Sequence, residues 1–153
     1  MFAVRRLRLR SAAVLLLAAA TLSWSCGKRA DPVQEAIDAI AKAANARDES
    51  ALFAHVSPGF QGADGSSFAD AQSLVRRAFA AYEILGVTFK DVKIERAEGA
   101  ARVRFRAEMS GQPRKIGGLD GLLPSSASYD FDLRMVPDGG TWKVAWAQWT
   151  RAS

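Results

Sequence analysis

Apolar side chains recur at helical spacing in three stretches of the first half of the chain. Asp31-Pro32 opens the first stretch with a capping carboxylate and a proline that suits the first helical turn. Asp48 precedes a second, short stretch, which Ser57-Pro58-Gly59 should end. Ser67 precedes the third stretch, and Gly86 is placed to end it. The pattern predicts three helices ahead of the first strand.

From Val87 onward, apolar and polar positions alternate, which is typical of antiparallel strands with one buried face. Val87 and Phe89 share one phase of the alternation, and Val92 and Ile94 share the other. An extra residue must therefore lie between the two pairs. We expect a β-bulge near Lys90-Asp91.

Three later strands are predicted over 101–109, 127–136 and 142–149. If the first two are neighbours, a basic row and an acidic row face each other on the outer surface. The basic row is Arg102, Arg104 and Arg106, and the acidic row is Asp130 and Asp132. Exposed cross-strand ion pairs contribute only about 0.2–1 kcal/mol each, so these rows should help set the register more than the stability.

The connection between those two strands, 110–128, is rich in glycine and proline and too long for a simple turn. Leu119, Leu122 and Leu123 give it apolar contact points and make it a candidate interaction loop. Two interpretations remain open. The leucines either pack down on the edge of the sheet or belong to a mobile flap that contacts another molecule.

The first 25 residues have the organisation of a secretory signal peptide. A basic stretch precedes the uncharged apolar run 12–22, and small or polar residues lead to Cys26. The run is only about half of the roughly 20 residues that a transmembrane helix needs, so we expect it to be removed. The segment 22–26, Leu-Ser-Trp-Ser-Cys, resembles the lipobox of bacterial lipoproteins, in which the cysteine is acylated.

The expected organisation is a signal peptide over 1–25, a lipidated tether over 26–30 and one domain over 31–150. Acylated Cys26 would hold the domain on a membrane of the bacterial cell envelope, facing the periplasm. The alternative is cleavage near Ala18-Ala19-Ala20, which would leave Cys26 as a free thiol.

The net charge of +5 mostly reports the N-terminal segment. Its four arginines, at positions 5, 6, 8 and 10, are among the chain's 21 basic residues, so the remainder is almost balanced against 16 acidic residues. A nearly neutral domain lacks the basic surface that nucleic acids attract. We therefore expect no nucleic-acid partner.

Few side chains could carry chemistry. His55 is the only histidine and Cys26 the only cysteine, so neither a catalytic triad nor a metal-ligand cluster has its usual residues. Glu108 and the two aspartates of the acidic row fall on the polar phase of their strands, which argues against an inward pair of carboxylates. We expect no catalytic residue, no metal and no cofactor.

The candidates for an interior site are aromatic or amide side chains on, or one turn from, the apolar phase of their elements. They are Tyr82, Tyr129, Trp142, Trp146 and Gln148. An apolar cavity with a few convergent polar groups is typical of small-molecule sites. The alternative is that these side chains only fill a solid core.

Three helices followed by a bulged antiparallel sheet resemble the nuclear transport factor two-like superfamily, which includes ketosteroid isomerases and SnoaL-like cyclases. The resemblance lies in Ala46-Arg47-Asp48-Glu49-Ser50-Ala51-Leu52 and in Gly140-Thr141-Trp142-Lys143-Val144, and it covers about 31–150. It implies an α+β cone, with the helices in the concave face of a curved sheet, a cavity at the open end and often a dimer through the sheet. Enzymes of the superfamily use an inward Asp, His or Tyr, and no such catalytic residue can be carried over to this chain.

Three functions remain open. The first is a non-catalytic, membrane-tethered module of the envelope that binds a small apolar ligand or another protein. The second is a proton-transfer enzyme of the isomerase or dehydratase kind, working through Tyr82 or Tyr129 and an inward carboxylate. The third is a structural, dimeric partner that uses the outer face of the sheet or the 110–128 loop and has a filled interior.

Overall fold

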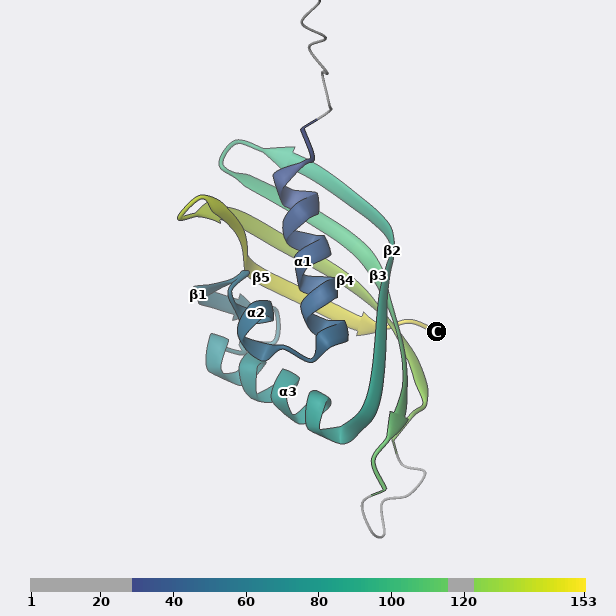
Figure 1. The fold of residues 1–153 in the computed structure, drawn as a ribbon. Helices are drawn as coiled ribbons and strands as arrows, with labels where there is room; N and C mark the ends of the chain where they lie inside the picture. The colour runs from purple at the N-terminus through teal and green to yellow at the C-terminus, as the bar shows by residue number, and fades with distance from the viewer. Residues whose placement is uncertain (1–28, 116–122) are drawn as a thin grey trace, which may run out of the picture.

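The computed structural model describes residues 29–115 and 123–153. The elements are α1 (Pro32–Ala46), α2 (Glu49–Phe53), β1 (Val56–Gly62), α3 (Phe68–Ala81), β2 (Tyr82–Ala97), β3 (Ala100–Pro113), β4 (Ser126–Asp138) and β5 (Thr141–Arg151). The strands form one sheet in the order β1-β5-β4-β3-β2, which curves around the helices (Figure 1). Strands β2 to β5 are antiparallel neighbours, and β1 joins β5 in parallel. The predicted α+β cone is confirmed, with a mixed sheet in place of a wholly antiparallel one.

Each helix begins where the capping residues predicted. The Asp31 carboxylate accepts a hydrogen bond from the Val33 N–H at 2.8 Å, and Asp48 accepts one from Ala51 at 2.9 Å. Ser67 and Asp70 form a reciprocal capping box at the start of α3. These side chains satisfy N–H groups that have no partner within the helix.

The third helix ends earlier than predicted. It stops at Ala81, not near Gly86, and the chain continues directly as β2 from Tyr82. Leu85 pairs with Gly111 of β3, where a Cβ atom would lie 2.5 Å from the Ile84 carbonyl oxygen. The prediction failed because this close strand pairing, made by residues distant in sequence, overrides local helical spacing.

The prediction of three helices ahead of the first strand is wrong. The strand β1 spans Val56–Gly62, lies between α2 and α3, and includes the proline expected to end α2. Val56 pairs with Val144 and Gln61 with Trp146, with an irregular register between them. Pro58 lies in that irregular stretch of the edge strand, where a missing N–H costs no ladder hydrogen bond.

The predicted bulge and the charged rows are both confirmed. The β2–β3 register shifts between Lys90 and Lys93, and Asp91 in the shift has a positive φ of 54°. Arg106 lies opposite Asp130 and binds its carboxylate through two hydrogen bonds, of 2.8 and 3.1 Å. Arg102 binds Asp132 in the same two-pronged way, at 2.9 and 2.5 Å.

The core lies between α1 and the middle of the sheet. Val33 and Ile37 from α1 and Val103 and Met135 from β3 and β4 are its largest fully buried side chains. Packing α1 against the central strands leaves the other two helices at one end of the concave face (Figure 1). The space between them and the sheet contains the pocket described below.

Several predictions fall on residues outside the described ranges. The signal peptide, Cys26, Leu119 and Leu122 lie there, so the structure does not test them. Leu123 is described and half-buried, and β3 and β4 extend into the predicted 110–128 connection from both sides. Within the described ranges, no helix is long and apolar enough to span a membrane.

Candidate functional site

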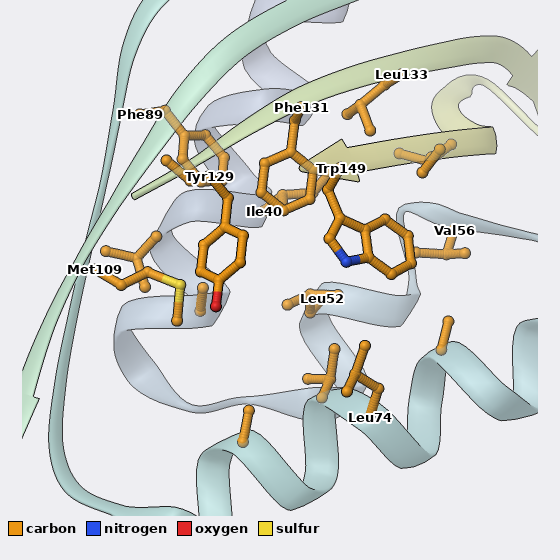
Figure 2. Close-up of a pocket in the computed structure, with 18 of the residues that line it drawn as sticks. Ile40, Leu52, Val56, Leu74, Phe89, Met109, Tyr129, Phe131, Leu133 and Trp149 are labelled. Carbon is orange, nitrogen blue, oxygen red and sulfur yellow. The ribbon is translucent and has the colours of Figure 1, made fainter. Parts of the chain in front are cut away.

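A pocket of about 380 Å³ lies between the concave face of the sheet and the helices (Figure 2). All three helices and all five strands contribute to its lining. Its volume is within the range of small-molecule sites, about 300–1,000 Å³. The fold therefore leaves a space of ligand size where a filled core could have been.

The sheet side of the pocket is built from four aromatic rings, one from each of β2, β3, β4 and β5. We call this set the aromatic ladder: Phe89, Phe105, Phe131 and Trp149. Their successive ring centroids are 4.3, 5.2 and 6.2 Å apart. Phe105 and Phe131 are stacked, with ring planes only 7° apart. Inward positions of neighbouring strands lie side by side, which explains the continuous row.

The opposite side is aliphatic and comes largely from the helices. Ile40 of α1, Leu52 of α2 and Leu74 of α3 face the ladder (Figure 2). No residue of α3 is buried, and Leu74 keeps 44% of its surface exposed although it lines the pocket. The pocket is thus open to solvent beside α3.

The helix α3 is held over the pocket by two contacts with α2. Arg76 donates two hydrogen bonds to the Glu49 carboxylate, at 3.0 and 2.7 Å, and these lower the pKa of Glu49. The rings of Phe53 and Phe68 meet edge to face with their centroids 5.2 Å apart. Phe53 itself lines the pocket, whereas Arg76 and Glu49 lie outside the lining and hold α3 in place without adding a charge to it.

Two polar side-chain groups enter the pocket. The hydroxyl of Tyr129 and the indole N–H of Trp149 both point into it (Figure 2). Neither group hydrogen-bonds to another group within the part of the chain that the structure describes. By contrast, the hydroxyl of Tyr82 donates to the Pro124 carbonyl oxygen at 2.9 Å. Tyr129 and Trp149 can therefore offer hydrogen bonds to a ligand.

The structure places one of the five predicted candidates, Tyr129, in the pocket lining. Tyr82 is half-buried outside it and tied to Pro124. Trp142 packs against the core cluster and carries the Arg96 guanidinium 5.5 Å from its ring centroid.

The other two candidates are displaced by a bulge in β5. The β4–β5 register shifts between Arg134 and Met135, after which Ala147 and Trp149 face the pocket. Trp146 lies outside the lining, and Gln148 is exposed on the outer face. The prediction assumed one unbroken alternation, and a single inserted residue reverses the direction of every later side chain.

Trp149 is the functional candidate that the sequence reasoning missed. A signal for it was present, because the apolar residues of the last strand fall on two phases, as they do in β2. Two phases in one strand predict a bulge, as they did near Lys90-Asp91, and a bulge in this strand predicts that Trp149 points inward.

The described lining contains no carboxylate, imidazole or amine. His55 lies outside it, where its carbonyl oxygen accepts a hydrogen bond from Val144 and its buried Nδ1 has no partner in the described structure. Within those ranges, no group of three or more His, Cys, Asp or Glu side chains could hold a metal. The arrangement can pack against apolar surface and donate hydrogen bonds.

Comparisons with known proteins identify the fold. No protein-family model matches the chain, and neither does any curated protein sequence. A candidate scytalone dehydratase of Novosphingobium aromaticivorans superposes with a TM-score of 0.68 at 11% identity, over 80% of this chain and 83% of its own. The hexachlorocyclohexane dehydrochlorinase LinA-type3 of Novosphingobium barchaimii gives 0.62 at 11% identity, over 80% and 85%.

The chain has the cone fold of the nuclear transport factor two-like superfamily. Bd1075 of Bdellovibrio bacteriovorus contains the same fold, with a TM-score of 0.64 at 14% identity, over 79% of this chain but only 40% of Bd1075. Two of these nuclear transport factor two-like structures are named as enzymes. Because unrelated functions share this fold, the fold does not identify the function, which depends on the residues of the pocket.

Proposed function

We propose that this protein is a non-catalytic binding module for a small apolar ligand, which occupies the pocket between the aromatic ladder and α3. The observation that carries the proposal is the lining, which is apolar except for the hydroxyl of Tyr129 and the indole N–H of Trp149. Moving apolar surface out of water stabilises a complex by about 25 cal/mol per Å². Two unpartnered donors would orient the ligand without requiring a charge on it.

The lining favours binding over proton transfer. A proton-transfer enzyme holds a base within about 2.6–3.2 Å of the proton that it removes. The described lining supplies neither a carboxylate nor an imidazole for that role. The enzymes that share the fold therefore lend no mechanism to this chain.

A fluorescent probe tests whether the pocket binds apolar molecules. N-phenyl-1-naphthylamine, which brightens in apolar surroundings, should bind to the domain over residues 27–153. Ala78→Phe places a ring in the pocket from α3, and Ala80→Phe places the same ring on an exposed position of the same helix. We expect Ala78→Phe to abolish the probe signal and Ala80→Phe to leave it unchanged. Circular dichroism melts of both variants check that they are folded.

Two outcomes would contradict the proposal. The wild-type domain could fail to bind the probe and every apolar compound tried in its place. Equal binding by the two phenylalanine variants would also contradict it, because the signal would then come from a surface outside the pocket.

We further propose that the module is exported and anchored through acylated Cys26. The signal-like segment 1–25 and the lipobox-like residues before Cys26 support this. Bacteria that express the full chain and are fed labelled palmitate should transfer label to it, and Cys26→Ser should lose both the label and the membrane association. An unlabelled wild-type chain in the soluble fraction would favour cleavage near Ala18-Ala19-Ala20.

Homodimerisation through the outer face of the sheet stays a prediction. That face carries the Arg102–Asp132 and Arg106–Asp130 ion pairs within one chain. Light scattering after gel filtration would give the mass in solution. A monomer at all concentrations would remove the dimer from the proposal without affecting the pocket.

A further inference from the structure

The aromatic ladder turns ring edges toward the pocket. Phe105 has Phe89 on one side at 4.3 Å and Phe131 on the other, stacked at 5.2 Å. Because neighbouring rings cover both of its faces, the part of Phe105 that remains for a ligand is its edge. The edge of an aromatic ring carries positive partial charge, and the face carries negative charge.

A row of ring edges is complementary to the face of a flat aromatic molecule. Edge-to-face contact between aromatic rings contributes about 0.5–1.5 kcal/mol beyond the buried area. An aliphatic chain has no negative face to present, so it gains only the area term. The ladder therefore distinguishes between two kinds of apolar ligand that would otherwise fit the same space.

The polar groups identify the remaining feature of the ligand. The indole N–H of Trp149 can only donate a hydrogen bond, and the hydroxyl of Tyr129 is free to donate one. Both point into the pocket from neighbouring strands, β4 and β5 (Figure 2). An oxygen atom that accepts hydrogen bonds, such as a carbonyl oxygen, satisfies either donor.

The lining also indicates the charge and size of the ligand. An ion buried without a partner is strongly disfavoured, and the described lining offers neither a cation nor an anion to pair with one. The pocket volume of about 380 Å³ lies near the lower end of the range for small-molecule sites, about 300–1,000 Å³. That space suits a molecule of two or three fused rings.

We propose that the ligand is an uncharged, flat aromatic molecule of two or three fused rings, with an oxygen that accepts a hydrogen bond from Tyr129 or Trp149. This inference rests on the proposed binding function and adds the ligand class to it. The rings lie across the edges of the aromatic ladder, opposite the aliphatic side chains of the helices.

Four small probes of nearly equal size test the proposal, each by displacement of N-phenyl-1-naphthylamine from the wild-type domain. 2-Acetylnaphthalene has the rings and the acceptor, and 2-ethylnaphthalene lacks the acceptor. Dodecan-2-one has the acceptor and the same number of carbon and oxygen atoms but no rings. 2-Naphthoate has the rings and a negative charge. We expect 2-acetylnaphthalene to bind about 5- to 10-fold more tightly than either uncharged analogue, and 2-naphthoate not to displace the dye.

Tyr129→Phe and Trp149→Phe each remove a donor. Comparing 2-acetylnaphthalene with 2-ethylnaphthalene in each variant separates hydrogen bonding from packing, because Trp149→Phe also makes the ring smaller. The variant that loses the bonded donor should weaken 2-acetylnaphthalene binding about 2- to 10-fold more than it weakens 2-ethylnaphthalene binding. Changes of equal size for both compounds in both variants would overturn the proposed hydrogen bond.

The outcomes for the two proposals differ. If dodecan-2-one displaces the dye as well as 2-acetylnaphthalene does, and Ala78→Phe abolishes dye binding, the pocket binds apolar ligands but the aromatic class is wrong. Displacement by 2-naphthoate at similar concentrations would overturn the requirement for an uncharged ligand. If neither the dye nor any of the four compounds binds, the proposed function itself fails.

Discussion

The two faces of strands β3 and β4 are built from alternate residues of the same segments and have opposite properties. On the inner face, Phe105 is only 6% exposed and stacks on Phe131. At the adjacent position of each strand, on the outer face, Arg106 pairs with Asp130 in solvent. Burial of apolar side chains on the inner face stabilises the fold. The exposed ion pairs on the outer face help set the strand register and add little stability. Substitutions at adjacent positions should therefore differ greatly in effect.

Phe105→Ala tests the inner face and should have the largest effect. Removing a buried phenylalanine ring costs about 3–5 kcal/mol, and here it also interrupts the aromatic ladder. Urea denaturation followed by tryptophan fluorescence measures the loss. Arg106→Ala is the matched control on the neighbouring position, and its unfolding curve should nearly overlay the wild-type curve. Similar losses in both variants would break the contrast between the faces.

Ala147→Asn tests which residues of β5 the bulge turns inward. Ala147 is 5% exposed and lines the pocket, so a polar amide there lacks partners and should cost about 1–3 kcal/mol. Gln148→Asn changes an exposed position and should stay within about 0.5 kcal/mol of wild type. The same urea titration compares the two variants. The reverse order of effects would mean that the strand alternates without a bulge.

A charge swap tests whether the basic and acidic rows of the outer face interact. Arg106→Asp places a second carboxylate opposite Asp130 and should lower the melting temperature by no more than a few degrees, since the pair is exposed. Adding Asp130→Arg restores the opposite charges and should recover most of that loss. If the double variant is no better than the sum of the single variants, the two rows do not interact.

The smallest effect should be a pH dependence. A hydrogen bond from Arg102 lowers the pKa of Asp132, and Arg106 does the same for the pKa of Asp130. A carboxylate with a lowered folded pKa stabilises the fold above its unfolded pKa, near 3.8, and loses that contribution as pH falls through the folded value. Stability should therefore fall below about pH 4.

Asp132→Asn should make this acid dependence shallower in melts recorded between pH 2 and 6, and added salt should reduce the difference further. Exposed Glu98→Gln serves as the control. A curve for Asp132→Asn that is as steep as the wild-type curve would show that other carboxylates carry the acid sensitivity.

Predictions from the sequence were correct for features that depend on neighbouring residues. They were wrong where pairing with a strand distant in sequence sets the end of an element. The caps at Asp31, Asp48 and Ser67 and the bulge near Lys90-Asp91 follow from local hydrogen bonding and from the period of two, and all are present. The end of α3 was wrong, because Gly111 of β3 pairs with the residues that follow Ala81.

The predictions of the candidate-site residues show the same contrast between regular and irregular strands. Tyr129 sits on a regular strand, so its inward direction could be predicted from alternation alone. Trp149 and Gln148 follow an irregular register, so their directions were predicted the wrong way round. Trp142 has an aromatic ring of the kind that lines such pockets, but it lies beside Arg96. That contact joins side chains of β2 and β5, which are not neighbours in the sheet, so the sequence could not predict it.

By itself, the sequence determined the α+β class, the inner and outer faces of the regular strands, and the shortage of acid, base and metal-binding residues. Those properties depend on composition and on periods that span a few residues. Only the tertiary structure decided that the interior holds a pocket and which donors reach it. A cavity is the space left over when helices and a curved sheet pack together, and its shape depends on bulges and close approaches between segments that are far apart in the chain.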